Sequence, residues 1–372
     1  MNVAFFSESY KPYISGVTNS METLKSGLEE LGHRVLVFSP NYPSAKKEKD
    51  IYRFPSLPST YPGYRLAIPM PGRTLNILKE SGVEIIHSHS PYQLGQLSRH
   101  YARKLKIPYV FTMHTLLSQY MHYVPFLPED ILINFTSAYI KSFCNRVDCV
   151  ITPTNKVSNE LRSIGVRTRI EVVPTGMDMA LAEKADPKGV RYNHGIPKHA
   201  KVLLFVGRLA KEKNLDFLLK AFEAIRGDRN DLYLLIAAGG PMNSELKGRG
   251  IRNAIFAGAV GYPEIFNYYA ASDIFVFSSL SETQGLVLAE AMACGIPQVA
   301  VAAQGVSDVV VDGVTGFLTK ESIDDFAAKV SELLSDDILY LKMSQGSRSN
   351  AQKVYSKEAF ARKIEQVYKS VI

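Results

Sequence analysis

The sequence predicts two α/β domains, each with a doubly wound, mostly parallel sheet. Short apolar runs recur along the chain and alternate with longer helical segments, which is the pattern of strands that are buried on both faces and joined by crossover helices. The 372 residues are enough for two such domains. A polar, charged connector at about residues 180–199 separates two series of these runs. The chain therefore repeats one architecture twice.

The first domain is predicted to cover residues 1–180, together with a last helix at about 355–372 that returns to it. Residues 2–6 form a buried strand, and the helix after it has an apolar face and ends at Gly32. That face consists of Met21, Leu24, Leu28 and Leu31. Further strands are predicted at 35–38, 83–86, 108–112, 147–151 and 170–173. The segment 40–71 contains seven prolines and has little periodicity, so we expect an irregular excursion there.

The second domain is predicted to cover residues 181–354. Its strands are expected at 202–206, 233–237, 254–256, 274–277 and 298–301. Open α/β sheets bind ligands at the carboxyl ends of their strands. We therefore expect a cleft between the carboxyl edges of the two sheets.

Composition excludes several classes of protein. The chain is 46% hydrophobic and 21% charged, as in globular proteins, and it has no apolar run long enough to cross a membrane. Its N-terminus lacks the basic and apolar regions of a signal peptide, so we expect a cytoplasmic protein. The three cysteines, Cys144, Cys149 and Cys294, lie in apolar surroundings without metal-ligand spacing, which indicates buried, reduced thiols.

Charge is unevenly distributed along the chain. Residues 1–180 contain 20 Lys and Arg against 14 Asp and Glu, whereas the remainder is nearly neutral. A basic first half suggests an anionic partner, either a membrane surface or a nucleic acid. The sequence has no nucleic-acid-binding motif and no Arg-rich helix. Gly16 follows the first strand but is not part of a G-x-G-x-x-G fingerprint, which disfavours a dinucleotide oxidoreductase.

The segment from Ser281 to Ala293 predicts a ligand site. It follows an apolar strand and becomes an Ala-rich helix at about Gly285, so its free backbone N–H groups suit a phosphate. Glu282 and Glu290 flank this helix start, and carboxylates are strong acceptors for sugar hydroxyls. The pattern predicts a sugar-nucleotide pocket. The alternative is a pair of carboxylates that complement the helix dipole on a solvated face.

Two cations lie in an earlier strand-to-helix loop of the same domain. Arg208 and Lys213 are five residues apart, which lets both reach one diphosphate. In a transfer that expels a nucleoside diphosphate, these cations would neutralise charge on the leaving group without a divalent metal. The alternative is a solvated basic loop.

Polar and aromatic residues of the first domain are candidates for the acceptor side. His114 follows a strand, whereas His87 and His89 alternate sides of an extended segment and are interpreted as structural. The segment 116–143 is rich in aromatic residues. Phe135, Tyr139 and Phe143 have helical spacing and form either a core-facing stripe, or an apolar acceptor groove or bilayer-facing surface. Basic residues that could meet anionic head groups lie nearby in sequence: Arg99, Arg103, Lys104 and Lys106.

Together these motifs resemble a family. Gly207-Arg208-Leu209 with Lys213, Ser281-Glu282 spaced to Glu290, and Met292-Ala293-Cys294-Gly295-Ile296-Pro297 resemble retaining glycosyltransferases that have two Rossmann-like domains, the GT-B fold. The resemblance implies that the first domain binds the acceptor and the second the nucleotide sugar. It places Glu290 on the ribose, Glu282 on the donor sugar, and Arg208 and Lys213 on the diphosphate. It also implies that the donor contacts the backbone at Gly16, Gly285, Leu286 and Val287. The loop at Val260 would contact the base, and His114 would contact the transferred sugar. Neither a covalent nucleophile nor an essential metal is expected.

A narrower resemblance concerns the acceptor. His114-Thr115 with Tyr120, His122 and Tyr123 is similar to a segment of bacterial diacylglycerol glucosyltransferases, although Leu117 and Ser118 depart from that pattern. The resemblance implies UDP-glucose as donor, a lipid acceptor such as diacylglycerol, and a cytoplasmic enzyme held at the inner, anionic face of the membrane. Phosphatidylinositol mannosyltransferases belong to the same group and are an alternative. A sugar-nucleotide epimerase and a non-catalytic sugar-binding protein are alternatives of other classes.

Overall fold

The computed structural model describes residues 1–372 except 14, 60–63, 115–128 and 304. The chain divides into two compact units. The first unit comprises Met1–Gly176 and Lys357–Ile372, and the second comprises Met177–Ser356. The chain thus passes between the units twice, once in each direction.

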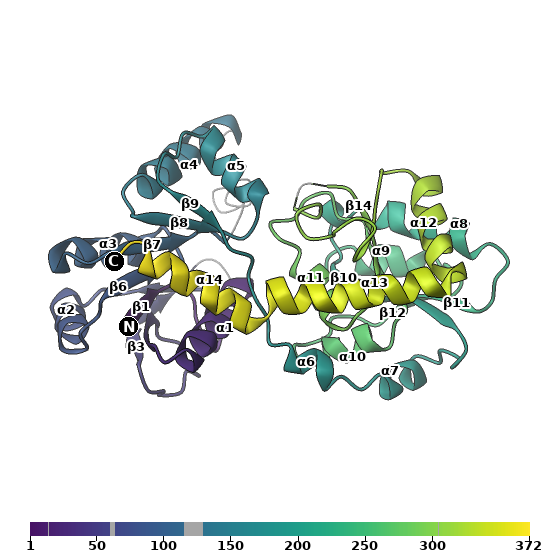
Figure 1. The fold of residues 1–372 in the computed structure, drawn as a ribbon, viewed down its shortest axis with the longest axis horizontal. Helices are drawn as coiled ribbons and strands as arrows, with labels where there is room; N and C mark the ends of the chain where they lie inside the picture. Colours follow the sequence, from purple (N-terminus) through teal and green to yellow (C-terminus); the bar gives the residue numbers. More distant parts are fainter. Residues whose placement is uncertain (14, 60–63, 115–128, 304) are drawn as a thin grey trace. The chain divides into compact units, whose positions relative to one another are not determined.

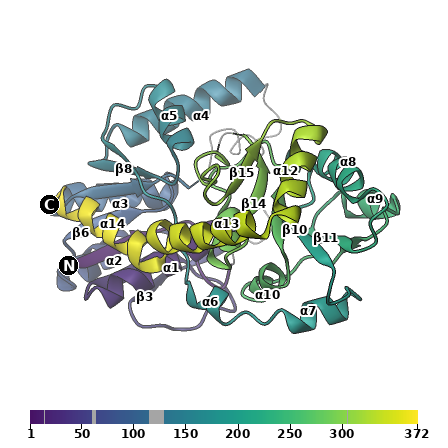
Figure 2. The same ribbon diagram turned by 45° about the vertical axis from the view of Figure 1, so that its right-hand side comes forward.

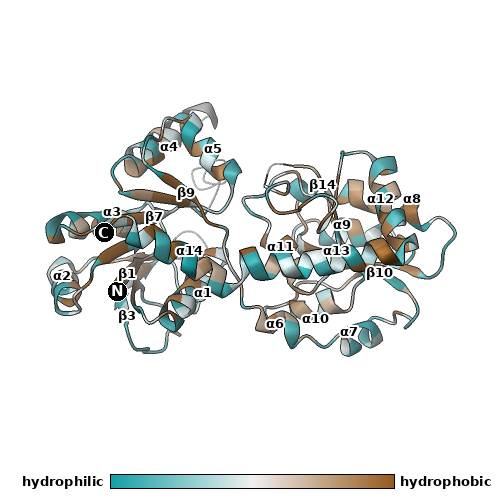
Figure 3. Ribbon diagram, viewed as in Figure 1, coloured by the Kyte–Doolittle hydropathy of each residue, from teal (hydrophilic) through white to brown (hydrophobic). Residues whose placement is uncertain are grey.

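The first unit contains a seven-stranded parallel sheet in the order β3-β2-β1-β6-β7-β8-β9. Its strands are β1 (Asn2–Phe6), β2 (Arg34–Pro40), β3 (Ile51–Phe54), β6 (Ile85–Ser88), β7 (Tyr109–Thr112), β8 (Cys149–Thr152) and β9 (Ile170–Val172). Most of these strands are buried along almost their whole length, as a sheet covered on both faces requires. Figure 3 shows these strands in the colour of hydrophobic residues, with helices of mixed character around them.

Helices join the strands of the first unit and cover its sheet (Figure 1). They are α1 (Gly16–Glu30), α2 (Pro71–Glu80), α3 (Gln93–Leu105), α4 (Glu129–Cys144), α5 (Asn155–Ser163) and α14 (Lys357–Lys369). The α1 helix begins where the Ser15 side chain accepts a hydrogen bond from the Thr18 amide. As predicted, its apolar face is buried. The last helix, α14, lies beside α1, where Lys357 Nζ is 2.5 Å from Glu30 Oε1 (Figures 1 and 2).

The second unit contains a six-stranded parallel sheet in the order β12-β11-β10-β13-β14-β15. Its strands are β10 (Lys201–Arg208), β11 (Leu232–Gly239), β12 (Ala254–Phe256), β13 (Ile274–Phe277), β14 (Gln298–Val301) and β15 (Gly316–Thr319). Its helices are α6 (Ala180–Glu183), α7 (Lys188–Asn193), α8 (Leu215–Arg226), α9 (Asn243–Gly248), α10 (Ile265–Ala270), α11 (Leu286–Ala293), α12 (Ile323–Ser335) and α13 (Asp337–Asn350). The predicted class, two α/β units with parallel sheets, is confirmed.

The prediction for residues 40–71 was partly wrong. The segment includes β3, at one edge of the sheet, and a separate antiparallel pair of β4 (Ser56–Pro58) and β5 (Arg65–Ala67). These strands have three or four residues each and are only partly buried, so they lack the apolar runs on which the prediction depended. The strand β15 was missed because it contains only two consecutive apolar residues, Phe317 and Leu318.

Two predictions from composition are consistent with the structure. None of Cys144, Cys149 and Cys294 forms a disulfide, and the first two are buried. No helix in the described part of the chain is long and apolar enough to span a membrane.

Candidate functional site

In the second unit, the predicted donor residues gather at the point where the strand order reverses. The β10 strand lies between β11 and β13, so the connections after β10 and β13 leave the sheet in opposite directions. In open α/β sheets this switch point is where the loops separate and a ligand enters. Arg208 is the last residue of β10, and the loop with Glu282 follows β13. The order of the strands therefore brings together residues that are some 70 positions apart in the sequence.

Lys213 and Glu282 form the central ion pair of this site. Lys213 Nζ donates to Glu282 Oε1 at 2.5 Å, and the Glu282 side chain is only 13% exposed. A hydrogen bond from a side chain to the backbone also joins the two loops, because the buried Ser278 hydroxyl donates to the Lys213 carbonyl at 2.7 Å. The pair thus brings one cation and one hydroxyl acceptor to the same place. A diphosphate and a sugar hydroxyl require these two groups.

The α11 helix begins directly beside this pair. Gly285 precedes it with φ +69°, a left-handed conformation that glycine adopts without strain. The amides of Leu286 and Val287 belong to the first turn of the helix and have no acceptor one turn earlier. A further loop closes on the other side, where a Cβ added to Gly305 would lie 2.3 Å from the Glu282 carbonyl oxygen. The start of α11, the Glu282 carboxylate and the Lys213 ammonium group therefore lie close together in one site.

Glu290 lies one to two turns farther along α11 and has a separate environment. The fully buried Tyr269 hydroxyl donates to Glu290 Oε2 at 2.8 Å. Desolvation raises the pKa of Glu290 above its ordinary value, and the hydrogen bond from Tyr269 opposes that rise. Sequence reasoning missed Tyr269, although it stands in the Asn-Tyr-Tyr segment of α10 just before β13. The two glutamates thus have different partners.

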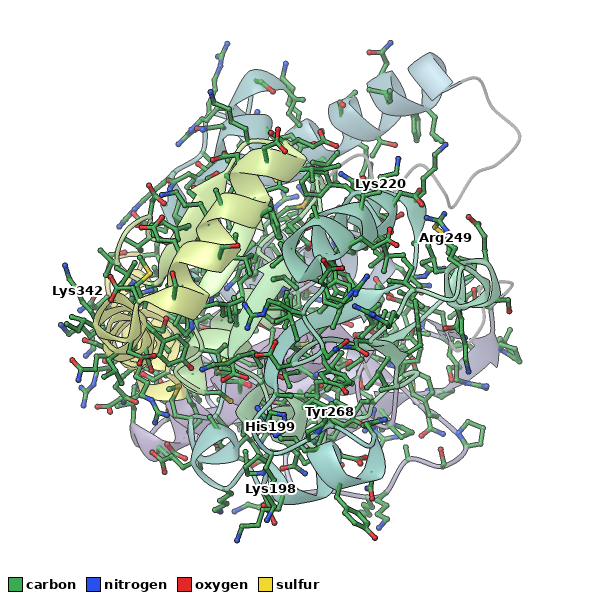
Figure 4. The ribbon with its side chains drawn as sticks, turned by 90° about the vertical axis from the view of Figure 1, so that its right-hand side faces the viewer. Lys198, His199, Lys220, Arg249, Tyr268 and Lys342 are labelled. Carbon is green, nitrogen blue, oxygen red and sulfur yellow. The ribbon has the colours of Figure 1, made fainter. Side chains whose placement is uncertain are left out.

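Arg208 and Val260 lie at the same edge of the second sheet. The Arg208 side chain is exposed at the end of β10. Val260 follows β12 and packs on the core of the unit. Other basic side chains of this unit, including Lys198, Lys220 and Lys342, project outward from its surface in Figure 4. Lys213 differs from these three because it is mostly buried and paired.

The first unit has a cavity at its own switch point. The β1 strand lies between β2 and β6, and the residues that follow β1, β6 and β7 line a cavity of about 660 Å³. The remaining lining residues come from the start of α1, from β5 and the residues next to β4 and β5, and from α3 and α4. The polar lining includes Ser9, His89, Ser90, Gln96 and His114, and the apolar lining includes Leu66, Leu132, Phe135 and Ile140. A cavity with polar groups at the ends of strands and an apolar wall suits an amphiphilic ligand.

Glu8 is a lining residue that sequence reasoning missed. It follows β1, and its Oε1 accepts a hydrogen bond from the Leu94 amide at 2.7 Å, so it caps the start of α3. Burial raises the pKa of its carboxyl to about 7, although hydrogen bonds from Leu94, Ser90 and Gly95 oppose the rise. Its position directly after a buried strand was the available signal, the same one that selected His114.

The raised pKa of Glu8 makes the folded state bind a proton more tightly than the unfolded state. Its stabilising contribution is therefore fully present below the unfolded pKa of 4.5 and is lost as the pH rises through about 7. We expect Glu8→Gln to gain roughly 2–3 kcal/mol of stability relative to the wild type between pH 5 and pH 8. Urea unfolding at several pH values measures this difference. Glu80→Gln, at the exposed end of α2, is the control and should show no such trend.

Three histidines of the first unit, His87, His89 and His114, form one cluster. His87 is buried and structural, as predicted, because its Nδ1 and Nε2 lie 2.6 Å from the hydroxyls of Tyr368 and Thr112. The prediction that His87 and His89 face opposite sides was wrong, since their ring centroids are 4.2 Å apart. Residues two apart in an extended segment point to the same face, so the alternation of the strand itself accounts for this proximity and the prediction misapplied it. His89 Nδ1 lies 3.0 Å from His114 Nε2, and both rings line the cavity.

The predicted aromatic stripe of α4 changes character along the helix. Phe143 is buried in the core, Tyr139 is partly buried, and Phe135 is 71% exposed. Tyr139 and Phe135 line the cavity. The core-facing interpretation therefore holds for the end of the helix, and the groove interpretation fits its start. Predictions on Thr115, Leu117, Ser118, Tyr120, His122 and Tyr123 concern residues outside those that the structure describes.

Gly16 is the remaining predicted donor residue. It is the first residue of α1 and belongs to the first unit, whereas the other donor residues belong to the second. It is exposed, and a Cβ added to it would meet no described atom within 4 Å. The backbone at Gly16 is therefore open to the approach of a ligand group.

Comparison with known proteins assigns the chain to a family. Residues 14–181 match the family model described as "Glycosyltransferase Family 4", and residues 190–350 match the one described as "Glycosyl transferases group 1". The chain is 31% identical to alpha-monoglucosyldiacylglycerol synthase of Streptococcus pneumoniae, over all of this chain and 86% of the relative. It is 30% identical to a GDP-mannose-dependent alpha-mannosyltransferase of Corynebacterium glutamicum, over 86% of this chain and 76% of the relative.

A solved structure agrees with the fold. Anabaena HepE in complex with UDP superimposes with a TM-score of 0.78 at 19% identity, and the match covers all of both chains. At that identity the likeness concerns the fold alone. The family matches, the full-length relative and the paired Rossmann-like units lead to one conclusion: the chain is a glycosyltransferase of group 1, a hexosyltransferase with the GT-B fold.

Proposed function

We propose that this glycosyltransferase moves a hexosyl group, glucosyl in the first instance, from a UDP-sugar to a diacylglycerol-type lipid. The observation that carries the lipid acceptor is the cavity of the first unit, which has an apolar wall and polar groups at its strand ends. The similarity to the S. pneumoniae alpha-monoglucosyldiacylglycerol synthase supports both the sugar and the acceptor. A diacylglycerol has a matching polar part and apolar part, namely one hydroxyl and two hydrocarbon chains.

The second unit is proposed to hold the donor. Arg208 and Lys213 bind the diphosphate, with the amides of the α11 start, and Lys213 has the buried position that such a contact requires. Glu282 accepts hydrogen bonds from hydroxyls of the sugar, and Glu290 accepts them from the ribose. Support for this division comes from their separate partners, Lys213 for Glu282 and Tyr269 for Glu290. The loop at Val260 is the proposed contact for the base.

The proposed reaction retains the configuration of the anomeric carbon. The acceptor oxygen forms its bond to that carbon on the face from which the diphosphate leaves, and the bond from the carbon to the phosphate oxygen breaks. The acceptor proton passes to the departing phosphate oxygen, so that the products are the glycoside and a nucleoside diphosphate. Arg208 and Lys213 stabilise the charge that develops on this leaving group, which is why we propose no essential metal and no covalent nucleophile.

The experiment that tests this function is a matrix of donors and acceptors. UDP-glucose, UDP-galactose and GDP-mannose are each combined with diacylglycerol, phosphatidylinositol or no acceptor in mixed micelles, with and without EDTA. We expect release of UDP from UDP-glucose only when diacylglycerol is present, and no loss of activity with EDTA. Absence of nucleoside diphosphate in every combination would contradict the proposal.

A second candidate function differs in sugar and acceptor. The similarity to the C. glutamicum GDP-mannose-dependent alpha-mannosyltransferase favours transfer of mannose from GDP-mannose. Phosphatidylinositol is the acceptor that the sequence resemblance proposes for this alternative. The same matrix distinguishes the two, because GDP release would then exceed UDP release. A nucleotide-linked isomer formed without an acceptor would instead identify an epimerase, and binding without any turnover a sugar-binding protein.

We also propose that the first unit binds the cytoplasmic, anionic face of the membrane. This unit contains 24 Lys and Arg against 15 Asp and Glu, whereas the second contains 19 against 21. Apart from Ile372, the exposed large apolar side chains described in the first unit gather on and beside the β4–β5 pair, on α4 and beside α3, near the cavity. They are Leu57, Leu66, Ile68, Tyr92, Ile133 and Phe135. An apolar rim around an acceptor cavity, on a basic unit, fits a lipid surface.

The rim gives a prediction about vesicle binding. Leu57 and Ile68 are 59% and 46% exposed, and neither lines the cavity. We expect Leu57→Ser with Ile68→Ser to weaken binding to anionic vesicles at least about fivefold, since burial of two such side chains contributes about 1–3 kcal/mol. Sedimentation with phosphatidylglycerol vesicles measures the binding.

A matched control comes from the second unit. Ile338 and Leu341 are exposed apolar residues of α13, and their replacement with serine should leave vesicle binding unchanged. Equal binding by the rim variant and the wild type would exclude the rim. High salt should weaken binding through the basic charge of the unit, so salt-insensitive binding would assign the contact to apolar residues alone.

A further inference from the structure

Two histidines in the cavity of the first unit are hydrogen-bonded to each other, and the direction of that bond has to be determined. His89 Nδ1 and His114 Nε2 are 3.0 Å apart, and the two rings are nearly parallel with centroids 5.3 Å apart. Burial lowers the pKa of His114 to about 4 and that of His89 well below its ordinary value, so both rings are neutral at physiological pH. A bond between two neutral imidazoles needs one N–H and one lone pair. Two arrangements of the protons are therefore open.

The surroundings of His89 distinguish these arrangements. His89 Nε2 is buried and has no hydrogen-bond partner among the described residues. If His114 donated, the single proton of His89 would have to lie on Nε2, as a buried N–H without an acceptor. If His89 donates through Nδ1, only a lone pair is left without a partner at Nε2. Buried N–H groups without an acceptor are rarer than acceptors with an unused lone pair, so the second arrangement is favoured.

His89 is also held firmly in this orientation. Its ring contacts Phe5 edge-on at a centroid distance of 4.8 Å and lies 4.2 Å from the ring of His87. His87 is itself fixed, because both of its nitrogens are hydrogen-bonded. Rotation of the His89 ring would therefore disturb a packed row of side chains. The direction of the bond to His114 is set by packing as well as by protonation.

From this geometry we propose that His89 is a positioning residue that fixes the tautomer of His114. By donating to Nε2, His89 leaves the proton of His114 on Nδ1, the nitrogen that remains for a ligand. His114 then donates a hydrogen bond to the ligand and does not accept one. The ligand group that suits this donor is a hydroxyl oxygen. Its identification as a hydroxyl of the transferred hexose rests on the proposed function. The hexose hydroxyl must therefore donate its own proton to a different acceptor.

The test reads the tautomer directly. The full chain is labelled with ¹⁵N-histidine, and long-range ¹H–¹⁵N correlation spectra distinguish protonated from unprotonated ring nitrogens. Signals are assigned with single variants, including His100→Gln at an exposed position within α3. We expect His114 to be protonated at Nδ1 in the wild type. Protonation at Nε2 would overturn the proposal, and this result needs neither a donor nor an acceptor substrate.

Two substitutions at His89 form a matched pair. His89→Phe keeps the ring and its packing but removes the donor, so the tautomer of His114 is no longer fixed: a form protonated at Nε2 should become detectable beside the Nδ1 form, and turnover should fall by up to roughly tenfold, the effect of one misdirected hydrogen bond. His89→Asn places an amide N–H near the position of Nδ1, so the tautomer and turnover should be restored to within about threefold. An unchanged His114 tautomer in His89→Phe would contradict the proposal.

The outcomes separate this inference from the proposed function. If the tautomer behaves as expected but no transfer occurs with any substrate, the proposed function fails and the role of His89 stands. If transfer occurs but His114 is protonated at Nε2, the role of His89 fails alone. Should His89→Phe not fold, the wild-type spectrum and the spectrum of His89→Asn still decide, because both proteins are expected to carry the proton on Nδ1.

Discussion

Replacement of Glu282 with alanine is expected to lower turnover by a factor on the order of 10² or more while the fold is kept. Glu282 is held in place by Lys213 and by the loop at Gly305, so its carboxylate has a fixed position relative to the start of α11. A hydroxyl contact made by a fixed carboxylate becomes stronger as the sugar gains positive charge in the transition state. The loss should therefore appear mainly in kcat. Steady-state kinetics with a saturating nucleotide sugar measure the loss of turnover, and circular dichroism shows whether the fold is kept.

The control for this variant is a glutamate from the neighbouring loop. Glu212 lies beside Lys213, but its side chain is exposed, so Glu212→Ala should retain turnover within about twofold. If Glu282→Ala turns over at the wild-type rate, Glu282 does not belong to the site, and the assignment of the donor sugar to this carboxylate is wrong.

Replacement of Lys213 with alanine is expected to lower kcat/KM by a factor on the order of 10²–10³. Two physical effects add here: the diphosphate loses a cation that stabilises its developing charge, and the mostly buried Glu282 carboxylate loses its ion-pair partner. Lys211→Ala is the control, because Lys211 belongs to the same one-turn 3₁₀ helix but is exposed. If both variants lost a similar factor in kcat/KM, the donor would be attracted by the basic charge of the loop as a whole, and a specific contact with Lys213 would be excluded.

The coupling between the two residues can be measured in the same series. Because Lys213 and Glu282 are in direct contact, the loss in the double alanine variant should be smaller than the product of the two single losses. Independent, multiplicative losses would mean that the ion pair does not persist in the complex with the donor.

The alternation of apolar runs and helical segments was enough to predict the two parallel sheets, because strands buried on both faces have an apolar pattern that few other structures share. It also selected Arg208, Lys213 and Glu282 as candidates, since each lies at the end of a predicted strand or in the loop after it, and Glu290 by its spacing from Glu282. The order of the strands was not predictable in this way. The approach of Lys213 to Glu282 depends on β10 and β13 being neighbours, which only the folded chain determines.

The first unit was harder to predict from its sequence. The β4–β5 pair has three residues in each strand and lies in a proline-rich segment, so it has no detectable period, and the apolar rim that it carries was missed. His89 was interpreted as structural because a single histidine in a sequence has no visible partner; its contact with His114 depends on the neighbouring strands β6 and β7. Glu8 was overlooked because a single carboxylate after a strand has no motif; its capping of α3 depends on a contact with residue 94.

The most direct test of the central claim is the structure of the product. The chain is incubated with UDP-glucose and diacylglycerol, the lipid product is purified, and its mass and its anomeric proton are measured by mass spectrometry and NMR. We expect one hexose on the free hydroxyl of the diacylglycerol, with the α configuration of the donor retained. A β-linked product, or UDP and free glucose without a glycolipid, would contradict this claim.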